Sequence, residues 1–300
     1  MNLHTGIIFK IYSNLLSILQ DPNITGLDLY DALKDGLKGY IGDKNMFFEP
    51  VKRGILYVIS KFSFEDCIMQ SHLDNDSVGF YIKSSEHLLW YFEEFLEFLR
   101  FHNFEIPKDI ENEFDRIVTT SECLFEESFN NIEKEYEYYD YLDYKNRTMR
   151  RMLDILKEKN RKNIEQISED YIIAVAARVF HDRELCAWIS DLLIQIGFPG
   201  EYKQWVERPR SWPKWVQADL FTREGGRCAL CGADFAEDPS IIAHIDHIIP
   251  ISKGGCNDIV NLQLLCERCN TSKKQEMLPV KPSIPNYLKR RIKGKEKKRV

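Results

Sequence analysis

Apolar side chains recur at helical spacing through most of the first two hundred residues. Between residues 84 and 101, one face of the expected helix is apolar and the opposite face is acidic; the apolar set is Leu88, Leu89, Phe92, Phe95, Leu96, Phe98 and Leu99. Residues 109–142 keep helical character but are strongly acidic and rich in tyrosine, and residues 170–197 form a further apolar helical stretch. The pattern therefore predicts a mainly α N-terminal domain.

A run of turn-forming residues interrupts this helical pattern. Three prolines lie between residues 199 and 215, so we expect a domain boundary near residues 198–212. The expected organisation is an acidic helical domain at 1–200, a second domain at 201–280 and a basic tail at 281–300.

The second domain has the pattern of a small α+β fold. Apolar and β-branched residues at 241–249 predict a strand, and residues 260–265 predict a second short strand. Residues 267–275 have the character of a helix start, and Gly254 and Gly255 supply turn residues between the strands. The order expected here is strand, loop, strand, helix.

Charge separates the two halves of the chain. Residues 1–200 hold 22 Lys and Arg against 35 Asp and Glu, about −13, whereas residues 201–300 hold 19 against 12, about +7. A basic segment suits a polyanion and an acidic one repels phosphate, so we expect nucleic acid to bind the second half. For the tail KRRIKGKEKKRV alone, a merely solvated charged face remains an equal alternative.

The chain has no pattern of a secreted or membrane-spanning protein. Lys10 interrupts the apolar amino terminus, no signal-peptide cleavage pattern follows it, and no stretch approaches the roughly 20 uninterrupted apolar residues that cross a bilayer. We therefore expect a cytoplasmic protein without membrane contact. In such a compartment the eight cysteines are expected to be thiols or metal ligands.

Four of those cysteines form two CxxC pairs. Cys228 with Cys231, and Cys266 with Cys269, are separated by 34 residues. Two such turns can present four thiolates to one tetrahedral ion, and Gly232 is placed to relieve the backbone of the first turn. The spacing predicts a structural Zn²⁺ site; the alternative is four buried cysteines without a metal.

The residues between the two CxxC pairs resemble a known family. The segment DHIIPISKGG, followed by NLQLLCERCN and then Lys273, is similar to HNH endonucleases of the four-cysteine, zinc-containing type over about residues 212–276. The resemblance implies a ββα-metal fold. The full expectation is a mainly α N-terminal domain plus a small α+β C-terminal domain with a four-cysteine zinc site.

The resemblance also implies catalytic and metal-binding roles. His247 would be the general base that takes a proton from the attacking water, as an imidazole near its ordinary pKa can. Asp246 and Asn270 would hold a catalytic Mg²⁺ or Mn²⁺ through oxygen atoms. Asn261 would fix the orientation and the tautomer of His247 by hydrogen bonding to the backbone that carries it.

Three lysines and a second histidine complete the expected site. Lys253, Lys273 and Lys274 would contact DNA phosphates. His244 shares a strand face with Asp246 by alternation, so it is expected to line the cleft or support the metal ligands, or else to be structural.

These observations predict a metal-dependent endonuclease that hydrolyses DNA phosphodiester bonds. The alternative is a catalytically silent zinc module that only binds nucleic acid. By analogy with the family, a restriction or anti-phage defence role fits an acidic helical partner domain.

The acidic helical domain is expected to bind protein, either a second copy of itself or a partner subunit, because it would repel DNA. Its aromatic content favours an interface. The alternative is that these rings fill the domain's own core: Phe92, Phe95, Phe98, Tyr136, Tyr138 and Tyr139.

Overall fold

A computed structural model of the chain describes residues 5, 8–9, 11–12, 50–65, 68, 85–128, 132–195 and 206–280. The described residues fall into two compact units. One lies within Met1–Leu33 and Ile59–Ala176, and the other within Lys34–Val58 and Ala177–Val300. The predicted domain limits at residues 200 and 280 stay predictions, and the predicted basic tail at 281–300 lies outside the described residues.

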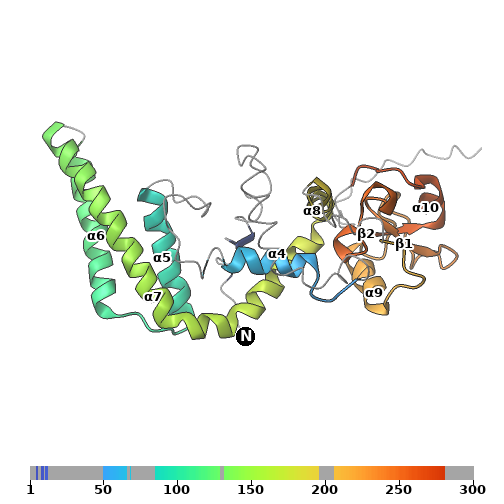
Figure 1. The fold of residues 1–300 in the computed structure, drawn as a ribbon, viewed down its shortest axis with the longest axis horizontal. Helices are drawn as coiled ribbons and strands as arrows, with labels where there is room; N and C mark the ends of the chain where they lie inside the picture. Colours follow the sequence, from blue (N-terminus) through green and yellow to red (C-terminus); the bar gives the residue numbers. More distant parts are fainter. Residues whose placement is uncertain are drawn as a thin grey trace, which may run out of the picture. The chain divides into compact units, whose positions relative to one another are not determined.

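The first unit is helical, as predicted. It contains α5 (Ser85–Phe101), α6 (Lys108–Ser128), most of α7 (Ile132–His181) and the second half of α4 (Ile55–Phe64). α6 and α7 lie side by side (Figure 1), and Tyr141 Oη of α7 donates to the carbonyl oxygen of Ile117 in α6 at 3.1 Å.

The apolar stripe predicted for α5 forms the core of this unit. Phe92, Phe95 and Phe98 are almost completely buried, and the Phe98 ring contacts Tyr171 of α7 with centroids 5.8 Å apart. These three phenylalanines therefore fill the unit's own core, which was the alternative to an interface role. Tyr139, by contrast, is 58% exposed, and the side chain of Tyr136 lies outside the described residues.

The second unit contains the small α+β fold. Its elements are α8 (Arg183–Gln195), α9 (Lys214–Arg223), β1 (Ala243–His247), the 3₁₀ turns η3 (Ile251–Lys253) and η4 (Ile259–Asn261), β2 (Leu262–Cys266) and α10 (Glu267–Lys273). The order strand, loop, strand, helix is the predicted one, and Figure 1 shows these elements gathered together. The fold is consistent with the predicted ββα arrangement.

The two strands form an antiparallel hairpin whose register positions the site. Ile245 pairs with Leu264 and Asp246 pairs with Gln263. Because side chains alternate across a strand, the face with Ile245 and Leu264 packs with Val216 and Leu220 of α9. Asp246 and Gln263 point to the opposite face, and α10 contacts both strands.

Buried ion pairs tie α8 and α9 to this hairpin. Arg183 Nε lies 3.0 Å from Glu224 Oε2, and Arg223 Nη2 lies 2.9 Å from Glu224 Oε1. Arg223 also donates to the carbonyl oxygen of Leu262 in β2. Since all three charged side chains are almost fully buried, each depends on the others for charge compensation.

Among the described residues, no helix is long and apolar enough to cross a membrane.

Candidate zinc centre and active site

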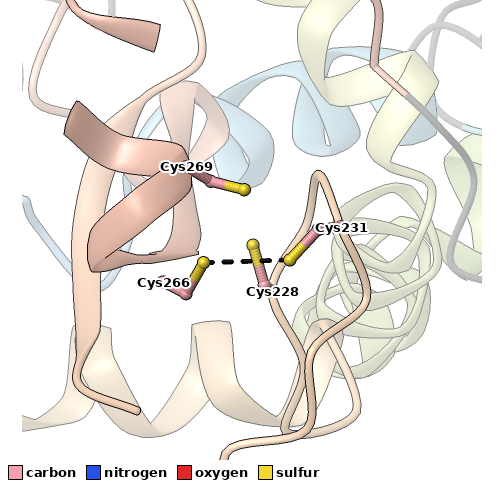
Figure 2. A group of neighbouring side chains, drawn as sticks. All are labelled: Cys228, Cys231, Cys266 and Cys269. Carbon is pink, nitrogen blue, oxygen red and sulfur yellow. Dashed lines mark hydrogen bonds between the residues drawn. The ribbon is translucent and has the colours of Figure 1, made fainter. Parts of the chain in front are cut away.

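The four predicted cysteines converge in the second unit (Figure 2). Cys228 and Cys231 lie on a turn after α9, Cys266 ends β2 and Cys269 lies in α10. The turn is closed by Gly232 N, which donates to Cys228 O at 2.9 Å. Gly232 has φ +73°, a left-handed conformation that favours glycine. Ala229 N, in the same turn, donates to Leu264 O of β2 at 2.8 Å, which holds the first CxxC pair beside the strand that ends at Cys266.

The sulfur positions fit a tetrahedral zinc ion. All four Sγ atoms lie within 4.8 Å of one another, and Cys231 Sγ is 3.8 Å from Cys266 Sγ. Four sulfurs at about 2.3 Å from one Zn²⁺ would stand about 3.8 Å apart at the corners of a tetrahedron. None of these cysteines is in a disulfide. The cluster is a metal-binding site whose ligand type and spacing suit zinc.

The thiols of this cluster differ in acidity. Burial raises the pKa of Cys228. For Cys231, burial alone would raise the pKa, but hydrogen bonds from the Ala233 backbone and the neighbouring thiols bring it down to about 7. Thiolates are the zinc-binding form, so these hydrogen bonds favour the zinc-binding form of Cys231, whereas burial disfavours it at Cys228.

Asp246 is held at the end of β1 by two neighbours. Gln263 Nε2 donates to Asp246 Oδ2 at 2.9 Å from the paired position on β2. Lys273 Nζ lies 3.1 Å from the same oxygen and also donates to His247 O at 2.8 Å. Lys273 is 2% exposed, so its ammonium is shielded from solvent and forms an ion pair with Asp246. Its predicted phosphate contact stays a prediction, as does that of exposed Lys274.

His247 is buried beside Asp246 and its ring is held from two sides. Its Nε2 lies 2.8 Å from Asn257 Oδ1, and its ring centroid lies 5.6 Å from that of Trp212. Burial lowers the pKa of His247 below 6.5; Arg208 and Lys273 act in the same direction, and Asn257 and Asp246 oppose them. Burial therefore favours the neutral imidazole, the form that can accept a proton.

Asn261 is completely buried and organises the loop after His247. Its Oδ1 accepts from Ile249 N at 2.8 Å, and its Nδ2 donates to the carbonyl oxygens of Ile249 and Cys256, each at 3.0 Å. Its own carbonyl oxygen accepts from Ile248 N at 2.7 Å. Asn261 thus bonds the backbone one and two residues beyond His247 and not the imidazole itself.

The remaining predicted residues lie around this centre. Asn270 is half-buried on α10, which contacts both strands. His244 is half-buried on β1, and its Nε2 is buried with no hydrogen-bond partner among the described residues. Lys253 in η3 is exposed, and its Nζ lies 3.3 Å from Glu276 Oε2.

Asn257, Gln263 and Trp212 contact the predicted site residues but are absent from the set expected from sequence. Gln263 could have been found from strand alternation, because it occupies the position paired with Asp246. Asn257 gave only a weak signal, as a polar residue between the double glycine and the second strand.

The comparisons with known proteins agree with this geometry. Residues 228–276 match the family model described as HNH endonuclease. The comparisons with curated proteins and with solved structures gave no match. The second unit therefore contains an HNH domain with a four-cysteine metal site, which supports nuclease-type activity in general and a nucleic acid as the substrate.

Proposed function

We propose that this chain is a metal-dependent endonuclease that hydrolyses phosphodiester bonds in DNA. The observation that carries the proposal is the pair Asp246 and His247, which is buried at the end of β1 within the HNH domain. In the sequence, this pair lies between the two CxxC pairs. A hard-oxygen ligand beside a neutral imidazole is the combination that metal-assisted hydrolysis requires.

His247 acts as the general base. Its neutral imidazole takes a proton from water; the water oxygen forms a bond to phosphorus, the bond to the leaving sugar oxygen breaks, and that oxygen takes a proton from solvent. Asn261 supports this role by fixing the backbone of Ile248 and Ile249 directly after the base.

Asp246 and Asn270 would hold Mg²⁺ or Mn²⁺. Carboxylate and amide oxygens are the ligands that these hard cations take. When bound, such an ion stabilises the charge that develops on the phosphate and the leaving oxygen. The contacts of Gln263 and Lys273 both fall on Oδ2 of Asp246, so we assign Oδ1 to the metal. Exposed Lys253 and Lys274 are assigned to flanking phosphates.

A catalytically silent zinc module is the second candidate. It is favoured by the Lys273 ammonium, which already neutralises Asp246. Incubation of the purified full-length chain with supercoiled plasmid separates the two candidates. Nicking or linearisation that needs added Mg²⁺ or Mn²⁺ and stops with EDTA supports the endonuclease. DNA binding without cleavage supports the silent module, and cleavage of RNA but not DNA contradicts the proposed substrate.

We also propose that the acidic helical unit joins two copies of the chain or binds a partner protein. Its net negative charge disfavours DNA, and aromatic side chains at its surface, such as Tyr139, suit an interface. Pairing two copies would supply one active site for each DNA strand.

A cytoplasmic location and a role in restriction or anti-phage defence fit the proposal that the acidic helical unit joins two copies or binds a partner. Light scattering tests it: a monomer that needs no partner for full activity contradicts it.

A further inference from the structure

Asn257 makes a side-chain hydrogen bond to the His247 ring. Asn257 is completely buried. Its Oδ1 lies 2.8 Å from His247 Nε2, and its Nδ2 donates to the carbonyl oxygen of Glu207 at 2.7 Å. The amide thus lies between the segment that precedes α9 and the imidazole.

These two contacts determine which imidazole nitrogen carries the proton. A backbone carbonyl oxygen can only accept a hydrogen bond, so the Nδ2 group of Asn257 must face Glu207. Oδ1 of Asn257 then faces His247, and an amide oxygen can also only accept. His247 Nε2 must therefore be the donor, which makes the neutral ring an Nε2–H tautomer with the lone pair on Nδ1.

We propose that Asn257 is a positioning residue that holds His247 as the Nε2–H tautomer and so presents Nδ1 to the attacking water. The proposal rests on the proposed role of His247 as general base. Proton transfer from water forms the Nδ1–H bond, and the positive ring that results keeps its Nε2–H bond to Asn257 Oδ1. The same hydrogen bond therefore serves the ring before and after it takes the proton.

The residues around Asn257 hold it in place. Asp258, the next residue, accepts from Val260 N through Oδ1 at 2.9 Å and from Ile55 N through Oδ2 at 3.2 Å. Both Asn257 and Asp258 are completely buried. Asn257 is thus anchored by its own amide to Glu207 and by its neighbour to α4 and η4. Among the described residues, the side chain of Asn261 bonds only backbone groups, so it does not contact the imidazole directly.

Nitrogen NMR of the full-length protein tests the tautomer without any need for activity. Histidine is labelled with ¹⁵N, spectra are recorded at pH 8 with zinc bound and no added divalent ion, and the His247→Ala variant assigns the signals. We expect Nε2 of His247 in the range of a protonated nitrogen and Nδ1 in the range of an unprotonated one. The reverse pattern would overturn the proposal.

Three variants test the role in catalysis, with plasmid cleavage measured at pH 8.5. Asn257→Leu removes both hydrogen bonds, and we expect kcat to fall by about 10- to 100-fold with DNA affinity unchanged, the usual effect of losing the partner that orients a histidine. Asn257→Asp keeps an acceptor for Nε2–H, so it should recover most of the rate. Asn160→Leu is the matched control: Asn160 is also a buried asparagine that donates to backbone carbonyls, but it lies in the other unit.

The outcomes separate this proposal from the endonuclease proposal. Zinc content and circular dichroism establish that each variant is folded. Wild-type cleavage by a folded Asn257→Leu variant, or equal losses in folded Asn257→Leu and Asn257→Asp variants, would overturn the role of Asn257. A wild-type chain that shows the Nε2–H spectrum but cleaves no DNA would instead contradict the endonuclease proposal.

Discussion

The ammonium of Lys273 lies 3.1 Å from Asp246 Oδ2, and the side chain of Lys273 is only 1% exposed. The same nitrogen donates to His247 O at 2.8 Å. A residue at the end of α10 thus fixes both the side chain of the proposed metal ligand and the backbone of the proposed base. The two proposed functional residues at the end of β1 depend on α10 for their position.

Replacement of Lys273 by methionine should destabilise the second unit. Met keeps most of the apolar stem but leaves the buried Asp246 carboxylate without its counter-charge, which costs on the order of 3 kcal/mol. Urea unfolding followed by tryptophan fluorescence measures the loss. Lys274→Met, at the exposed neighbouring position, should change stability by less than about 0.5 kcal/mol. Equal stabilities of the two variants would contradict the assigned ion pair.

Gly255→Ala should disrupt the loop that follows His247. A Cβ atom at Gly255 would lie 1.9 Å from Ile249 O and 2.6 Å from Asn261 Nδ2, so it would collide with the hydrogen bond that Asn261 makes there. We expect a loss of about 1–3 kcal/mol or more in unfolding free energy and lower cleavage activity.

Gly225→Ala is the matched control for that variant. Gly225 has φ +61° and no atom within 4 Å of an added Cβ, so only the backbone cost of about 1 kcal/mol applies. If Gly255→Ala lowered the unfolding free energy no more than Gly225→Ala does, this result would contradict the close approach of the Gly255 backbone to Ile249 O and Asn261 Nδ2.

Asp258 should make stability depend on pH. Burial raises its pKa to about 6, although hydrogen bonds from Val260 and Ile55 oppose this. A folded-state pKa above the unfolded value of 3.8 gives a stability contribution that is full at low pH and is lost as pH rises through about 6. Over that window the loss amounts to about 3 kcal/mol.

Asp258→Asn isolates this effect because asparagine does not ionise in this range. The difference in unfolding free energy between the variant and the wild type should shift in favour of the variant between pH 4 and pH 7. A constant offset between the two proteins across that range would show that Asp258 does not titrate as assigned.

The purified protein should contain about one zinc per chain that survives mild EDTA, whereas cleavage should need added Mg²⁺ or Mn²⁺. Cys266→Ser should remove the zinc and unfold the second unit, because metal binding and folding are coupled. Cys123→Ser, at an exposed cysteine of α6, should retain it. A zinc content near zero in the wild type would contradict the assigned metal.

Local patterns were enough to predict some parts of the structure. The apolar residues at helical spacing in α5 predicted a buried helix face, because a helix with one apolar face must bury that face. The CxxC spacing predicted the cysteine cluster, because each pair needs only one turn to converge. The first strand followed from the β-branched residues around Asp246, and the second from the apolar run at residues 260–265.

Other parts depend on contacts between distant segments. Asp258 accepts from Ile55 N, 203 residues earlier in the chain, and no local pattern indicates that pairing. The sequence predicts a phosphate contact for Lys273, and only the packing of α10 against β1 shows that its ammonium is buried beside Asp246. Asn257 reaches His247 because the loop folds back over the end of β1, which depends on tertiary structure.

Plasmid cleavage by His247→Ala is the most direct test of the proposed chemistry. The variant and the wild type, both shown to be folded and zinc-loaded, are incubated with supercoiled DNA at pH 8 with Mg²⁺ or Mn²⁺. We predict metal-dependent cleavage by the wild type and a rate lower by about 10²- to 10⁴-fold in the variant, the usual cost of losing a general base. Cleavage by His247→Ala at the wild-type rate would contradict the assignment of His247 as the base.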